Sequence, residues 1–132
     1  MAKVYHASKT NGRVVFDNLE NDILIAQFSG EIDLDFAIES ADYIIEYIES
    51  GARRLLYNLG EAIPVFSPVV LMDEVRRIGR AAGKSARFAY LAPEDMFARH
   101  FMLIEAAAFN DGIDVKFFSD MSEARKWLKE AG

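Results

Sequence analysis

Few side chains in this sequence have the type and spacing that a catalytic site requires. The two histidines, His6 and His100, could each serve as a general base. A base needs an orienting partner and a nucleophile within hydrogen-bonding reach, and no motif places such groups near either histidine. There is no cysteine, which excludes a thiolate nucleophile, a thiolate metal site and a disulfide. We therefore expect no catalytic residue and no enzymatic activity.

Three carboxylates, Glu31, Asp33 and Asp35, alternate along the chain and come nearest to a metal site. Oxygen ligands of this kind suit Mg²⁺ or Ca²⁺. However, the stretch has no glycine-containing loop of the calcium-binding type, and Asp35 is well placed to cap a following helix. Gly79 and Gly83 lie within and at the end of an expected helix, so they form no phosphate-binding loop. We expect no metal and no cofactor.

The charge of the chain argues against a nucleic-acid partner. The net charge is −6, whereas phosphate binding needs a basic surface. The charge is also uneven, because residues 14–52 hold ten acids and no lysine or arginine, while residues 75–93 hold five basic residues and no acid. Two solvated helix faces would explain this pattern. Opposed charges can also steer a second copy of the chain, so a homodimer is a further expectation.

Hydrophobic periodicity predicts strands that alternate with helices, after an opening hairpin marked by the turn signal Asn11-Gly12. Expected strands lie at residues 4–8, 14–16, 23–28, 55–59, 88–91 and 115–118. Expected helices lie at residues 35–51, 67–83, 93–110 and 120–128. Such alternation implies mainly parallel pairing through right-handed crossovers. We therefore expect one α/β domain over residues 1–132, with a mixed, mostly parallel sheet of about five strands and about four helices packed on it.

An unusually apolar segment, residues 62–66, is expected in a loop between a strand and a helix, where polar residues are usual. It could complete the core, dock a protein partner or form the mouth of an apolar pocket. Four side chains of the third expected helix could face it: Phe97, Phe101, Met102 and Phe109. The candidate contacts for a partner or an apolar ligand are Pro64, Val65, Phe66, Phe97 and Phe101.

No apolar run approaches the length that crosses a membrane, and the Met-Ala-Lys-Val-Tyr-His start lacks the apolar core of a signal peptide. We therefore expect a bacterial-type cytoplasmic protein that does not span a membrane.

Three stretches resemble the SpoIIAA-like branch of the STAS domains, the family of anti-sigma-factor antagonists and sulphate-transporter tails. Residues 22–32 resemble the family's early strand, which ends in a glycine and precedes a helix. Residues 54–59 resemble its central strand. Residues 115–118 and 123–128 are similar to its ending, an aromatic strand before a helix that carries Ala and Trp-Leu. The resemblance covers about residues 20–130 and implies a single STAS-like domain.

In anti-sigma-factor antagonists, a serine at the start of the second helix is phosphorylated and controls partner binding. The family's pattern, laid over this sequence without gaps, places Ser67 at that position. The chain departs from the pattern where Asn58 replaces an aspartate, Phe66 an acidic residue and Val69 a glycine. The resemblance implies that Ser67 is a phosphoacceptor. Helix capping by Ser67, with Pro68 at the first helical position, is the alternative.

Two hypotheses of function follow. The first is a non-enzymatic regulatory or binding module that contacts a protein partner, or a second copy of itself, through the loop before the second helix. The second is a carrier or sensor of a small apolar or lipid-like ligand, which the family's resemblance in fold to lipid-carrying Sec14 domains supports.

Overall fold

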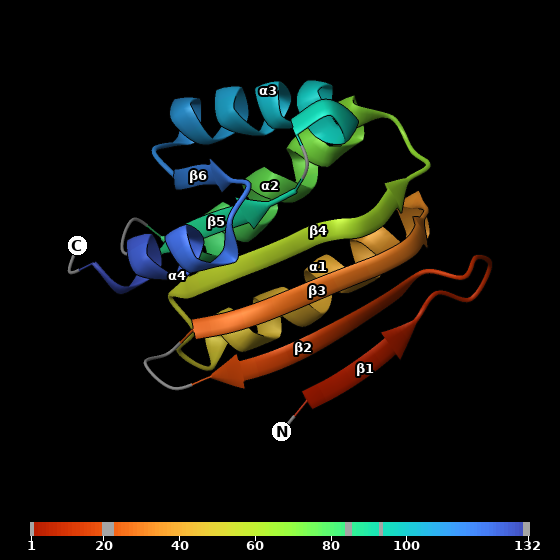
Figure 1. The fold of residues 1–132 in the computed structure, drawn as a ribbon, viewed down its shortest axis with the longest axis horizontal. Helices are drawn as coiled ribbons and strands as arrows, with labels where there is room; N and C mark the ends of the chain where they lie inside the picture. Colours follow the sequence, from red (N-terminus) through yellow and green to blue (C-terminus); the bar gives the residue numbers. More distant parts are fainter. Residues whose placement is uncertain (1, 20–22, 84–85, 93, 131–132) are drawn as a thin grey trace.

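Six strands form one sheet, in which their spatial order is the order of the chain (Figure 1). The computed structural model describes residues 2–19, 23–83, 86–92 and 94–130. The strands are β1 (Ala2–His6), β2 (Arg13–Leu19), β3 (Ile23–Ile32), β4 (Arg54–Pro64), β5 (Arg87–Leu91) and β6 (Asp114–Phe118). The helices are α1 (Leu34–Glu49), α2 (Pro68–Ala82), α3 (Glu94–Asp111) and α4 (Met121–Lys129). The expected mixed α/β sheet with four helices is confirmed, with six strands in place of about five.

The pairing of the strands determines where the helices lie. β1, β2 and β3 pair antiparallel, whereas β3, β4, β5 and β6 pair in parallel. The parallel strands are joined by α1, α2 and α3 in turn, and right-handed crossovers that all advance in one direction place their helices on the same face. α4 follows the last strand and lies on the opposite face, in front of the sheet in Figure 1.

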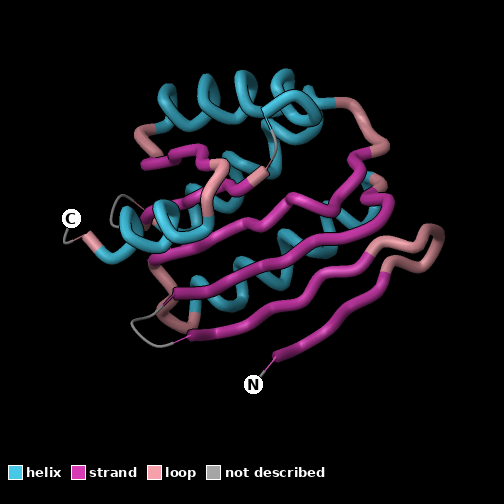
Figure 2. Tube along the Cα trace, in the orientation of Figure 1, coloured by secondary structure: helices cyan, strands magenta, loops and turns pink. Residues whose placement is uncertain are grey.

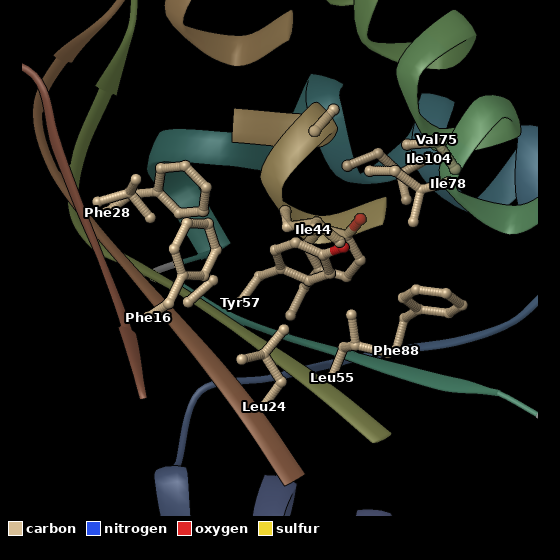
Figure 3. Packing of buried hydrophobic residues seen from close by; sticks show 14 of the residues in the cluster. Phe16, Leu24, Phe28, Ile44, Leu55, Tyr57, Val75, Ile78, Phe88 and Ile104 are labelled. Atoms are coloured by element: carbon tan, nitrogen blue, oxygen red, sulfur yellow. The ribbon is translucent and has the colours of Figure 1, made fainter. Parts of the chain in front are cut away.

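The larger core lies between the sheet and helices α1, α2 and α3. Alternate strand residues point into it, so Phe16, Leu24 and Leu55 are almost fully buried. Helix α1 adds Ile44 and α2 adds Ile78 from the other side (Figure 3). Burial of this apolar surface holds the three helices on one face of the sheet.

A smaller core lies on the opposite face, under α4. It contains the strand residues Ile23, Leu56 and Ala89, and α4 adds Ala124 and Leu128 as its inner face. Trp127 is partly buried and packs against the same cluster. Helix α4 covers the β4 to β6 side of the sheet, and no helix is drawn in front of β1 to β3 in Figure 2.

The first helix begins two residues earlier than the capping pattern predicts. Asp33, and not Asp35, is the N-cap of α1, because its carboxylate accepts the backbone N–H of Phe36 at 2.9 Å. Asp35 lies in the first turn, where it pairs with Lys9 at 2.7 Å. Ser67 caps α2, as the capping alternative for this residue predicts, and Asp120 caps α4.

The expected loop at residues 62–66 is wrong for most of its length. β3 and β4 remain paired after a bulge between Gln27 and Ser29, so that Ile32 lies opposite Pro64. The two extensions satisfy each other's backbone hydrogen bonds, which neither stretch could do alone. Only a short connection separates the end of β4 from α2.

Among the described residues, no helix has both the length and the apolar character needed to cross a membrane.

Candidate functional site

The end of β4 and the start of α2 form the segment that the sequence singles out. The backbone N–H of Val65 donates to the carbonyl of Ile32 at 3.0 Å, so the extended conformation continues one residue past β4. Ser67 is itself extended, and its hydroxyl accepts the backbone N–H of Val69 at 3.3 Å. Pro68 then occupies the first turn, where its missing N–H costs nothing.

Side chains alternate along this segment, as they do along any extended strand. Ile63 is 50% exposed and Val65 is 49% exposed. Pro64 and Phe66 are partly buried, and both line a cavity that is partly open to the surface. Val69, in the first turn of α2, is 65% exposed. The exposed residues Ile63, Val65 and Val69 are called the docking residues below.

The cavity has a volume of about 100 Å³ and lies between the sheet and helices α1 and α2. Its wall is almost entirely apolar, and includes Ile44 from α1, shown beside Tyr57 in Figure 3, and Ile78 from α2. Ile104 of α3 also reaches it. A space of this size lined by apolar side chains forfeits packing contacts, which is unusual in a protein interior.

Two hydroxyl groups interrupt the apolar wall. Ser40 of α1 and Tyr57 of β4 both line the cavity, and both residues are almost fully buried. Neither the Ser40 Oγ nor the Tyr57 Oη has a hydrogen-bond partner among the residues that the structure describes. Burial, together with the neighbouring Tyr90, raises the pKa of Tyr57 well above its ordinary value. The Tyr57 ring stacks on the Tyr90 ring with centroids 4.6 Å apart.

An ion-pair network joins α1 to α2 beside the cavity. Glu74, which also lines the cavity, accepts from the Arg77 Nη2 at 2.9 Å. The Arg77 Nη1 donates to Asp42 of α1 at 2.6 Å, and this bond raises the pKa of Arg77. The acidic stretch 14–52 and the basic stretch 75–93 are therefore partly paired with each other within one chain. This pairing accounts for part of the charge asymmetry without a second copy.

The residues predicted to contact a partner or an apolar ligand therefore do not form one surface. Pro64 and Phe66 line the cavity, whereas Val65 lies on the outer surface. The side chains of Phe97 and Phe101 lie outside the described residues. Two further apolar side chains of the third helix, Met102 and Phe109, are strongly exposed and border a groove along β6.

The three candidate metal ligands do not converge. Asp33 is engaged as a helix cap, and Asp35 is paired with Lys9. No group of three or more histidine, aspartate and glutamate side chains in the described ranges could hold a metal ion. His6 is an exposed residue of β1, and the side chain of His100 falls in the part of α3 that is not described.

Sequence reasoning missed Ser40 and Tyr57. The available signal was a polar residue within the apolar stripe of α1, since Ser40 lies one turn from Phe36 and one turn from Ile44. Tyr57 gave no such signal, because tyrosine is common in buried strands.

Solved structures with this fold include an anti-sigma factor antagonist and two forms of SpoIIAA. An anti-sigma factor antagonist from Mycobacterium paratuberculosis matches with a TM-score of 0.71 and 15% identity, over 96% of this chain and 100% of that chain. The unphosphorylated anti-sigma factor antagonist SpoIIAA matches with a TM-score of 0.59 and 16% identity, over 89% of this chain and 99% of that chain. The phosphorylated Bacillus cell fate determinant SpoIIAA matches with a TM-score of 0.58 and 15% identity, over 88% and 99%.

No protein-family model matches the sequence, and no curated protein sequence matches it. The likeness is therefore one of architecture, carried by strand order, helix placement and nearly complete coverage. The chain has the SpoIIAA-like STAS fold of the anti-sigma factor antagonists.

Proposed function

We propose that this protein is a non-enzymatic regulatory module that binds a protein partner through the docking residues Ile63, Val65 and Val69. The observation that carries the proposal is the exposure of three large apolar side chains within seven residues, around the start of α2. Apolar side chains left in water at one place are typical of protein-binding sites. The structural neighbours named as anti-sigma factor antagonists support a role of this kind.

Ser67 lies between Val65 and Val69 and is exposed. In our proposal it is the phosphoacceptor of the module. A phosphate there would be stabilised by the N-terminal end of α2, whose amides and dipole favour negative charge. The same charge would oppose the burial of the neighbouring valines against a partner. Phosphorylation would in this way turn binding off. One of the structural neighbours is named as a phosphorylated form, which is consistent with this mode of control.

The test is a comparison of four proteins in capture from native extract: the wild type, Val65→Asp, Ser67→Asp and the control Val4→Asp. Val4 is 48% exposed on β1, so it matches Val65 in residue type and exposure but lies at the far edge of the sheet. We expect the wild type and Val4→Asp to retain the same protein. We expect Val65→Asp to lose it, because a partner would have to bury a charge, and Ser67→Asp to weaken it.

Equal retention by Val65→Asp and the wild type, with both proteins folded, would refute the proposed surface. Self-association is part of the same proposal, since a second copy of the chain could be the partner. We also propose that the module acts in the cytoplasm.

A second candidate function, the carriage or sensing of a small apolar ligand, is favoured by one specific observation. The cavity behind Pro64 and Phe66 is apolar and contains two buried hydroxyl groups that lack partners among the described residues. Such a combination is the usual character of a small-molecule site.

A further inference from the structure

The cavity limits the size of any molecule that it could hold. It measures about 100 Å³, and an apolar cavity of about 150 Å³ is known to accommodate benzene. The space is thus smaller than one that holds benzene, so a single small ring fits only if the partly exposed side chains of Pro64 and Phe66 shift outward. A fatty acid or a phospholipid tail is too long, unless most of it lies outside.

The wall of the cavity excludes charged molecules. Its surface is almost entirely carbon, and the neutral rings of Tyr57 and Tyr90 form part of it. The carboxylate of Glu74 is already engaged by Arg77, so it is not free to balance a cation. A charged group placed here would lose its hydration without compensation.

The two hydroxyl groups add a specific requirement. Serine within a helix usually bonds to the carbonyl four residues earlier, but the Ser40 Oγ makes no hydrogen bond to any described residue. The Tyr57 Oη also makes no hydrogen bond to any described residue. Tyr57 lines the cavity from the sheet, whereas Ser40 lines it from α1. Buried polar groups in native proteins nearly always have a hydrogen-bond partner. A polar atom of a bound molecule would supply the partner that these two hydroxyl groups lack.

We propose that this cavity binds a small, uncharged, mostly apolar molecule that carries one hydrogen-bonding group, and that Ser40 and Tyr57 recognise that group. This inference rests on the second proposed function and specifies its ligand class. Access is from the side of the cavity residues that remain partly exposed, which are Ala37, Leu59, Pro64, Phe66 and Glu74.

The experiment compares benzene with phenol, which differ only by a hydroxyl group. Protein labelled at isoleucine methyl groups is titrated with each compound and followed by NMR. Four isoleucines line the cavity and report on binding: Ile32, Ile44, Ile78 and Ile104. Ile23 lies under α4 on the other face and serves as an internal control. We expect saturable shifts at the cavity isoleucine methyls and none at Ile23, with phenol binding roughly 5–10-fold more tightly than benzene, the effect of about one hydrogen bond.

Two variants isolate the polar contact. Tyr57→Phe and Ser40→Ala remove one hydroxyl each and leave the apolar wall in place. At least one of them should weaken phenol binding by roughly 5–10-fold and change benzene binding by less than about 2-fold. A larger residue at the rim, Ala37→Leu, should weaken both compounds together.

Absence of saturable shifts at the cavity methyls for both compounds would overturn the site. Binding of phenol that neither hydroxyl variant weakens would overturn the proposed recognition. Both readouts are independent of protein capture, so their failure would leave the docking residues untouched, and failure of capture would leave the cavity untouched.

Discussion

Val65 and Phe66 are adjacent in the chain but lie in different surroundings. Val65 is half exposed on the outer surface, whereas Phe66 packs against the core and lines the cavity. The sequence suggests both as surface contacts, because an apolar run in an expected loop gives no information on which side chain turns inward. The continued pairing of the segment with β3 decides this, since it imposes the alternation of a strand.

This difference predicts opposite outcomes for the same substitution at neighbouring positions. Phe66→Asp should lower the free energy of unfolding by about 1–3 kcal/mol, because it removes apolar packing and places a charge against the core. Val65→Asp should change it by less than about 0.5 kcal/mol. Urea denaturation measures both values. Equal stability of the two variants would show that the alternation of outward and inward side chains does not extend past Pro64 to Val65 and Phe66.

At the scale of the elements, sequence reasoning is most reliable where one residue determines a local structure. Ser67 and Asp120 each accept a backbone N–H of the helix that they precede, as their residue types predict. The ends of β3 and β4 could not be predicted in the same way. The sequence ends these two expected strands at residues 28 and 59, and only the pairing of β3 and β4 with each other keeps the residues that follow extended. The sequence likewise favours Asp35 as the cap of α1, two residues after the observed cap Asp33.

Close approach of elements is equally hidden from the sequence. Gly79 reads as an ordinary helix-interior glycine, but a Cβ atom at this position would collide with the side chain of Ile113, just before β6. The glycine allows α2 to pack tightly against the start of the last strand. Nothing in the local pattern identifies that neighbour.

The capping role of Ser67 is testable apart from any regulatory role. Ser67→Ala should destabilise the protein by about 1 kcal/mol, because the N–H of Val69 loses its acceptor. Ser67→Asp should keep close to the stability of the wild type, since aspartate caps equally well and its charge suits the helix N-terminus. Thermal unfolding of the three proteins distinguishes these cases. A Ser67→Ala protein as stable as the wild type would show that the 3.3 Å bond contributes nothing.

At the scale of the whole molecule, the architecture follows from sequence more fully than the site does. Alternating periodicities predict parallel strands joined by helices, and the handedness of crossovers then places α1, α2 and α3 on one face. The cavity has no such signature. Its volume depends on how side chains from α1, β4 and α2 fit together after the helices have packed, and patterns in the sequence do not determine that fit.

The two central tyrosines predict a loss of global stability in alkali. Burial raises the pKa of Tyr90, and burial with the neighbouring Tyr90 raises that of Tyr57, so both phenols stay protonated in the folded protein. In the unfolded chain they ionise near about pH 10. The folded state then binds more protons, so stability is intact below about pH 10 and falls as the pH rises further.

Denaturant unfolding at about pH 9 and about pH 11 measures this effect. The double variant Tyr57→Phe with Tyr90→Phe should lose less stability over that interval than the wild type. Tyr43→Phe serves as a comparison, because Tyr43 is only half-buried and its pKa is raised chiefly by the hydrogen bond from its hydroxyl to Glu39 at 2.9 Å, whereas burial is the main cause at Tyr57 and Tyr90. If the double variant and the wild type lose equal stability, the central phenols do not govern the alkaline transition.

The agreement between strand order and chain order has a consequence for folding. Every strand pairs only with its immediate predecessor and successor, so no strand has to insert between two that already exist. The largest loop that any pairing must close is a single crossover, and its entropic cost stays small. The sheet can therefore assemble progressively from the hairpin, each new strand joining a growing edge. Interruption of synthesis at any crossover would leave a shorter sheet of the same pattern.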